Sequence, residues 1–235
     1  MKLRIILLLA AVLVELLLLR LGFWQLARGE EKQQSLRAVD AVLQEKKAVP
    51  LAKALNLTQG FTWVQGRAVF REAPLLLLDN QRRGSQVGVS VFQAAEDESG
   101  RLFLVDLGWL PVNGNRQLPK PAALSGALAL EGLLLPPPSP GLAIGPAYSV
   151  QPDGSLLLMR LDREALSASL KAPLAARILR VDPAQRIGFA RDLSVQANTL
   201  PPEKHRAYAL QWFGLAAAFA VLCIGVMMRK THANG

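Results

Sequence analysis

The sequence predicts a membrane protein of the α+β class, in which an N-terminal and a C-terminal transmembrane helix flank a β-rich periplasmic domain. Two observations predict this class. Each end of the 235-residue chain carries a long apolar run, and the region between them consists of short apolar or alternating runs separated by Gly, Pro, Asn and Asp. We expect the central sheet to be antiparallel and barrel-like, because closely spaced strands and turns are typical of such sheets.

Composition and charge exclude several classes of function. The formal net charge is +9. The basic residues are nevertheless scattered and form no stripe with interleaved aromatic side chains, so we expect no nucleic-acid partner. The only cysteine, Cys223, lies within the C-terminal apolar run. A disulfide framework and a paired-thiol metal site are therefore excluded within one chain.

Residues 5–27 are predicted to form the first transmembrane helix, after a cytoplasmic tail at residues 1–4. A helix of 23 residues is about 34 Å long, which is enough to cross a bilayer. Inserting Glu15 into the bilayer costs roughly 3 kcal/mol, but each surrounding Leu, Ile and Val residue favours insertion by roughly 0.3 to 0.6 kcal/mol. Insertion of the whole segment is therefore favoured. The alternative is a cleaved signal peptide. The stretch LGFWQLAR is bulky where a peptidase needs small residues, and this favours an uncleaved anchor.

Residues 28–206 are predicted to form the exported domain. Its first segment, GEEKQQSLRAVDAVLQEKKAV, predicts a helix that leaves the membrane with Leu36, Val39 and Leu43 on one face. A second, short helix is expected over residues 162–170, where acidic residues follow a strand-like run. The expected strands are TWVQGRAVF, PLLLLDNQ, VGVSVFQAA, RLFLVDLGWLPV, ALSGALALEGLLL, SLLLMRL and AARILRV.

Residues 207–228 are predicted to form the second transmembrane helix, and residues 229–235 a second cytoplasmic tail. This apolar run contains no charged residue, and basic residues bracket it. Both tails carry lysine and arginine, so the positive-inside rule places both termini in the cytoplasm. Because no Ser- and Arg-rich presequence precedes the first span, we expect a multi-pass protein in the lipid bilayer of a bacterial inner membrane.

The sequence offers little for catalysis, and we expect no enzymatic activity. No strand-to-helix nucleophile elbow surrounds the central serines, and no histidine precedes His205 to activate one. The acidic run at residues 96–98 is typical of a solvated turn rather than an acid–base pair. A membrane-tethered hydrolase is therefore disfavoured.

The start of the second span carries the clearest candidate site. His205, Tyr208 and Trp212 are three and four residues apart, so on a helix they project from one face within roughly 60° of one another. A neutral imidazole is a usual ligand of haem iron, and aromatic rings beside lipid suit a porphyrin. Trp24 lies at the same expected depth in the first span. On the residues alone, the favoured interpretation is that these side chains simply anchor the helices at the membrane interface, and a ligand site is the alternative.

Four stretches, in order along the chain, resemble the Surfeit locus protein 1 family of cytochrome c oxidase assembly factors: LGFWQLAR, LLDNQRRGSQVGVSVFQ, VDLGWLPV and HRAYALQWFGL. The resemblance covers essentially the whole chain. It implies a chaperone of respiratory-chain biogenesis that receives haem a from haem a synthase and assists its insertion into cytochrome c oxidase subunit I. The family's proposed haem-binding histidine corresponds to His205, which would hold the haem iron, and the tryptophan of its first-span motif corresponds to Trp24.

Two positions depart from the family's usual pattern. Asp106 and Leu107 precede the GW pair where Asn and Arg are usual, and Glu203 and Lys204 replace an asparagine that is common just before the histidine. The first departure removes a cation from the central motif, and the second changes the charge beside the histidine. An alternative function of a different class is a membrane scaffold that stabilises oxidase subunit I without binding haem. In that case the aromatic side chains would serve to pack helices.

Overall fold

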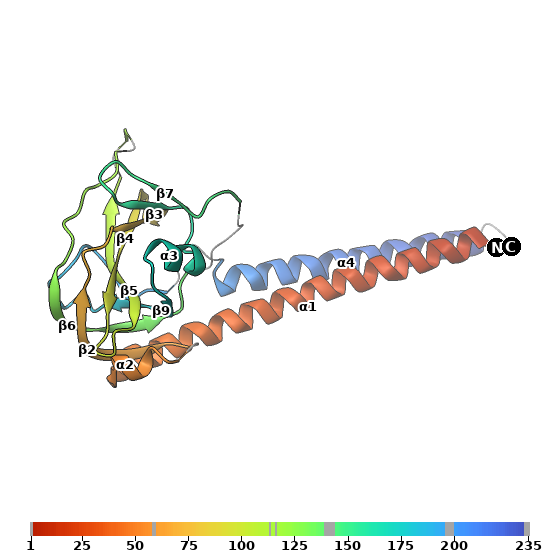
Figure 1. Ribbon diagram of the computed structural model, residues 1–235. Coiled ribbons are helices and arrows are strands. Elements are labelled where there is room, and N and C mark those ends of the chain that lie inside the picture. The colour runs from red at the N-terminus through yellow and green to blue at the C-terminus, as the bar shows by residue number, and fades with distance from the viewer. Residues whose placement is uncertain are drawn as a thin grey trace. The chain divides into compact units, whose positions relative to one another are not determined.

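A computed structural model describes residues 2–57, 60–112, 114–115, 117–138, 144–195 and 200–232. The chain divides into two compact units, one of residues 38–198 and one that joins residues 1–37 to residues 199–235. Met1 of the expected N-terminal tail and residues 233–235 of the expected C-terminal tail lie outside the described residues. The elements, shown in Figure 1, are α1 (Lys2–Glu45), β1 (Val49–Pro50), α2 (Leu51–Ala54), β2 (Thr62–Phe70), β3 (Leu76–Arg83), β4 (Gln86–Glu96), β5 (Leu102–Pro111), β6 (Gly126–Leu135), β7 (Tyr148–Val150), β8 (Leu156–Leu158), α3 (Arg163–Ser169), β9 (Leu174–Val181) and α4 (Pro202–His232).

The unit of residues 38–198 is built on one nine-stranded sheet with the strand order β1-β2-β6-β9-β5-β4-β3-β8-β7. The prediction of an antiparallel sheet is only partly right, because the pairs β1–β2, β3–β8 and β5–β9 are parallel. The sheet is not a closed barrel either. A short additional pairing joins β2 to β4, which are not neighbours in this order, but β1 and β7 remain as the two edge strands of the sheet.

The misjudged strand directions have a simple cause. The spacing of apolar runs and turns indicates where strands lie, but not which strands become neighbours. The strand β9 pairs with β5 only after the chain has passed through β6, β7, β8 and α3, and that long connection permits a parallel pair. All seven expected strands are present, and β2 has the expected bounds of residues 62–70.

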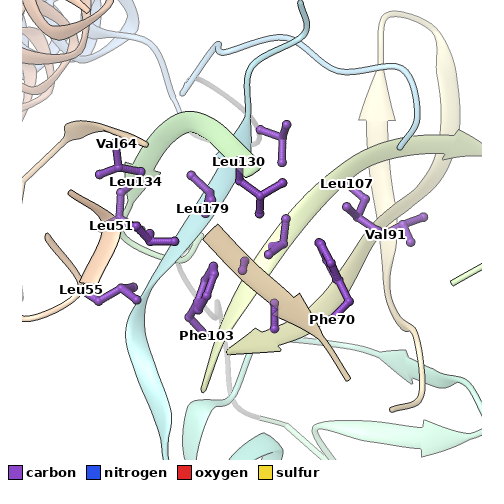
Figure 2. Close-up of a cluster of buried hydrophobic side chains, with 14 of the residues drawn as sticks. Leu51, Leu55, Val64, Phe70, Val91, Phe103, Leu107, Leu130, Leu134 and Leu179 are labelled. Carbon is purple, nitrogen blue, oxygen red and sulfur yellow. The ribbon is translucent and has the colours of Figure 1, made fainter. Parts of the chain in front are cut away.

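The hydrophobic core occupies both faces of the central strands. In β5, Phe103, Val105 and Leu107 belong to one buried cluster, whereas Leu102 and Leu104 belong to another. Successive side chains of a strand point to opposite faces, so a strand that is covered on both faces is apolar almost throughout. Figure 2 shows the first cluster, in which Phe103 and Leu107 lie among leucine and valine side chains from other strands and from α2.

The end of α1 packs on the sheet through a third cluster. Val39 is buried against Trp63 and Leu133, and Leu43 packs beside them. The indole Nε1 of Trp63 donates a hydrogen bond to Glu131 Oε1 at 2.7 Å. This confirms the predicted helix after the first span, and it confirms that Val39 and Leu43 lie on its packed face.

The second predicted helix is also confirmed, as α3. The side chain of Asp162 accepts a hydrogen bond from the backbone N–H of Ala165 at 3.1 Å and so caps the first turn. Leu166 is the buried residue of this helix and belongs to the second core cluster.

Two helices are long and apolar enough, by length and composition, to cross a membrane. One lies within Ile5–Glu45 and the other at Pro202–Val226. Many of their large apolar side chains face outward: Leu13 is 69% exposed and Leu210 is 74% exposed. Outward apolar side chains of this kind suit lipid contact, because an apolar helix surface is stable only where water is excluded.

Candidate functional site

The helices α1 and α4 pack side by side in antiparallel directions within the unit of residues 1–37 and 199–235 (Figure 1). Thirteen of their sheltered residues follow alternating intervals of four and three residues, which is the heptad spacing of a two-stranded coiled coil; Leu19, Leu21, Phe213 and Ala220 beside them are also half-buried. We call the thirteen positions the seam. The seam positions are Ala11, Glu15, Leu18, Gly22, Gln25 and Gly29 in α1, and Pro202, His205, Ala209, Trp212, Ala216, Phe219 and Cys223 in α4.

Small residues let the two helices approach closely along the seam. A Cβ atom at Gly22 would overlap the ring of Phe213, and this ring contacts Phe23 edge to face with centroids 5.2 Å apart. Ala209 and Ala216 are buried at 1% and 2% exposure. Gly214 and Ala218, which have the small-xxx-small spacing of many transmembrane helix contacts, do not provide this contact, because both are exposed and nothing lies within 4 Å of a Cβ at Gly214. The heptad positions, rather than the nearest small-xxx-small pair, decide which face packs.

The imidazole of His205 lies on the seam and meets a polar partner from α1. Its Nδ1 is 2.8 Å from Gln25 Oε1. An amide oxygen only accepts hydrogen bonds, so Nδ1 carries the proton and donates it. In this tautomer Nε2 keeps a free lone pair, and among the described residues Nε2 has no hydrogen-bond partner. A histidine whose Nδ1–H is held by an acceptor while Nε2 is free has the arrangement typical of metal-ligating histidines.

Two further contacts fix the backbone around His205. A Cβ atom at Gly29 would lie 3.4 Å from His205 Cβ and 3.5 Å from the carbonyl oxygen of Pro202, so the glycine lets α4 begin close to α1. Arg206 donates a hydrogen bond to Gln33 Oε1. Along α1, the close contact at Gly29 lies about one turn and the second polar link at Gln33 about two turns beyond Gln25, the partner of the imidazole.

The aromatic side chains predicted for the site do not all share the seam. Trp212 is half-buried on the seam, whereas Tyr208 is 43% exposed and Trp24 is 50% exposed. Tyr208 and Trp212 share a helix face with His205 by spacing. The residue that makes a hydrogen bond with the imidazole is Gln25, which the sequence indicated only as part of the first span. The sequence feature that could have identified Gln25 is a polar residue at a heptad position within an apolar helix.

Glu15 also lies on the seam. Its side chain is half-buried, and Oε2 is buried without a hydrogen-bond partner among the described residues. The same described part of the chain contains no group of three or more His, Cys, Asp or Glu side chains that could hold a metal ion.

The two central stretches, LLDNQRRG and VDLGWLPV, meet in the unit of residues 38–198. The indole Nε1 of Trp109 in β5 donates to the backbone oxygen of Gln81 in β3 at 2.9 Å. Asp106 Oδ2 accepts from Arg180 Nε of β9 at 2.8 Å, and Asp106 Oδ1 accepts from the backbone N–H of Gly108 at 3.0 Å. A cation therefore stands beside the central motif, although it comes from a strand 74 residues further along the chain.

Comparison with family models matches residues 12–217 of the chain to the SURF1 family. Comparison with curated protein sequences finds no match. The family match begins inside α1 and ends inside α4, so it includes the seam from Glu15 to Ala216 and the whole sheet between the helices. It covers well over half of the chain, and it agrees with the order of the four stretches found in the sequence. On this evidence the chain is a member of the SURF1 family, a membership that is consistent with a role in cytochrome oxidase assembly.

Proposed function

We propose that this protein is a non-enzymatic assembly factor for haem–copper cytochrome c oxidase, and that it assists the delivery of haem a to subunit I. Family membership supports the assembly role. The single observation that supports haem binding is the His205–Gln25 hydrogen bond, which leaves Nε2 of the imidazole free as a ligand. Haem a synthase as donor, subunit I as client and a bacterial inner membrane as location follow from the same proposal.

The residues of the helix pair fit such a cofactor in their chemistry. His205 would supply a nitrogen ligand through Nε2, and Gln25 would hold the ring in the tautomer that leaves Nε2 unprotonated. Tyr208, Trp212 and Trp24 would supply aromatic surface beside lipid, where their exposed area is compatible with a flat apolar ligand. When bound, the haem would contribute an iron centre that accepts an imidazole nitrogen.

The test is the pigment of protein purified in detergent from cells that make haem a. We expect a Soret band for the parent protein and its loss in His205→Gln, because a side-chain amide is a much weaker ligand for haem iron. Gln25→Leu should lower haem content by about tenfold or more, as expected when a group that orients a metal ligand is removed. Trp24→Ala should show a smaller loss.

The matched control is Gln33→Ala, which removes the neighbouring hydrogen bond between the helices without touching His205. It should keep the parent's haem content. If His205→Gln and the parent carry the same pigment with the same spectrum, His205 is not the ligand.

A scaffold that stabilises subunit I without haem is the second candidate, and Glu15 favours it. Glu15 Oε2 is buried and has no hydrogen-bond partner among the described residues, so a third helix, such as one of a client protein, would supply the missing donor once the carboxyl turned toward it. Haem-free parent protein that still co-purifies with subunit I would support this alternative.

A further inference from the structure

A cavity of about 330 Å³ lies beside β3, β4 and β5 in the unit of residues 38–198. Its volume falls within the range of small-molecule sites, which is about 300 to 1,000 Å³. Four arginines and two aspartates are among the residues that line it: Arg82, Arg83, Arg180, Arg191, Asp106 and Asp192. The charged lining therefore has an excess of two positive charges, and we call it the arginine cavity.

Two of these arginines already donate hydrogen bonds within the protein, Arg180 two of them and Arg191 five. Arg180 donates to Asp106 at 2.8 Å and to the backbone oxygen of Ser194 at 2.7 Å. Arg191 donates to five backbone carbonyl oxygens, those of Val181, Asp182, Gln185, Ile187 and Phe189. Burial lowers the pKa of the Arg191 guanidinium, and the carboxylates of Asp106 and Asp182 oppose this shift. These hydrogen bonds hold the segment of residues 181–194 in place, and the charges of both side chains add to the positive potential of the cavity.

Arg83 is not satisfied in this way. Its Nη1 is buried and has no hydrogen-bond partner among the described residues. Its Nη2 makes a long contact of 3.5 Å with Asp192, a side chain that is 59% exposed. A buried donor without an acceptor is rare and costs free energy, so such a donor is a sign of a missing partner. A guanidinium presents its N–H groups as a planar fork, which matches the two oxygens of a carboxylate or phosphate.

An aromatic ring, that of Trp109, also lines the cavity. The indole of Trp109 is half-buried, and its hydrogen bond to the backbone of Gln81 holds it in place. A Cβ atom at Gly88 would lie 2.5 Å from Trp109 Cε2, so the ring lies directly over this glycine. The cavity thus combines an unpaired guanidinium N–H group with an apolar wall.

We propose that the arginine cavity binds a small molecule through a carboxylate or phosphate group, with Arg83 Nη1 as the principal donor and Trp109 as the apolar wall. The acidic residues of the lining do not favour a cation, because each already contacts an arginine. This site is independent of the proposed haem function, since it rests on different residues and on a different unit of the chain.

The experiment uses the full-length protein in non-ionic detergent at constant ionic strength, with inorganic phosphate and succinate as separate probes. Tryptophan fluorescence should change saturably with at least one probe, and Trp109→Phe should remove the change. Arg83→Gln should weaken binding roughly tenfold or more, because a hydrogen bond to a charged group is lost. The affinity of Arg83→Lys for the probe should lie between those of the parent and of Arg83→Gln, because lysine keeps the charge but lacks the planar fork.

Two further variants separate binding from folding. Arg67→Gln removes one charge from an exposed position of β2 outside the cavity and should leave binding unchanged. Asp192→Asn removes the carboxylate that competes for Arg83 and should tighten binding by about threefold, the scale of an exposed ion pair. Binding of phosphate but not succinate would identify the ligand's acidic group as a phosphate, and binding of succinate but not phosphate would identify it as a carboxylate. The proposal is overturned if neither probe saturates, or if Arg83→Gln and Arg67→Gln bind equally well.

Discussion

Gly108 provides the sharpest test of how the central motif is built. Its φ is 114°, a value that a residue with a side chain rarely adopts. A Cβ atom there would lie 2.7 Å from the carbonyl oxygen of Phe189 and 2.8 Å from its carbonyl carbon. Both are backbone atoms, so Gly108→Ala must displace the chain at residues 189–190 rather than turn a side chain aside.

The magnitude follows from what that displacement breaks. Backbone strain at such a φ costs about 1 to 3 kcal/mol. Two backbone hydrogen bonds flank the clash, from Phe189 N to Leu107 O at 2.6 Å and from Trp109 N to Ala190 O at 2.9 Å. Each contributes about 0.5 to 1.5 kcal/mol net. We therefore expect Gly108→Ala to lower the free energy of unfolding of this unit by about 2 to 6 kcal/mol in total.

The assay is thermal unfolding of the full-length protein in detergent, followed by the circular dichroism of the sheet. For a domain of this size the expected loss corresponds to a decrease in Tm of roughly 4 to 24 °C. The control is Gly114→Ala, because a Cβ atom at Gly114 would meet nothing within 4 Å. A Gly108→Ala protein whose Tm lies within about 2 °C of this control would contradict the prediction. At about 2 to 4 °C per kcal/mol, so small a difference corresponds to a destabilisation of about 1 kcal/mol or less.

Two other predictions concern the helix pair. Reporter fusions at Asn115 and at Gly235, a residue outside the described part of the chain, should report the periplasm and the cytoplasm respectively, because basic residues stand in both tails; a cytoplasmic signal at Asn115 would contradict this topology. Glu15→Leu should leave membrane insertion intact and lower the yield of assembled oxidase, whereas Glu15→Gln, which keeps a polar group on the seam, should have a smaller effect. Normal oxidase assembly with Glu15→Leu would show that the carboxyl is dispensable.

Much of the fold could be predicted from local pattern, and the errors have physical causes. The alternation in TWVQGRAVF identified β2, because period-2 burial is a local property. The strands β1 and β7, of two and three residues, are too short to show any period. The parallel pair β5–β9 could not be predicted, because partner choice depends on contacts between segments far apart in the chain.

The candidate site shows the same limit. His205 was singled out by its type and its aromatic neighbours, but its partner Gln25 lies 180 residues away and is recognisable only through the heptad register of α1. The central motif is similar in this respect. Asp106 and Leu107 supply no cation, yet Arg180 from β9 brings one to within 2.8 Å of Asp106. Position in the folded sheet, rather than position in the motif, determines the charge of this region.

The polar residues of the seam differ in how well they are satisfied, and this difference separates the two candidate functions. His205 Nδ1 has Gln25 Oε1 as its partner within the helix pair, whereas His205 Nε2 remains free for a ligand. Glu15 Oε2 has no partner among the described residues. In lipid an unpaired polar group costs several kcal/mol, because no water replaces the missing hydrogen bond. A membrane-embedded carboxyl is therefore stabilised when another helix supplies a donor, which makes Glu15 the seam residue best suited to contact a client protein. Loss of pigment through His205 together with loss of assembly through Glu15 would place cofactor and client on one seam, whereas an effect of Glu15 alone would identify a scaffold.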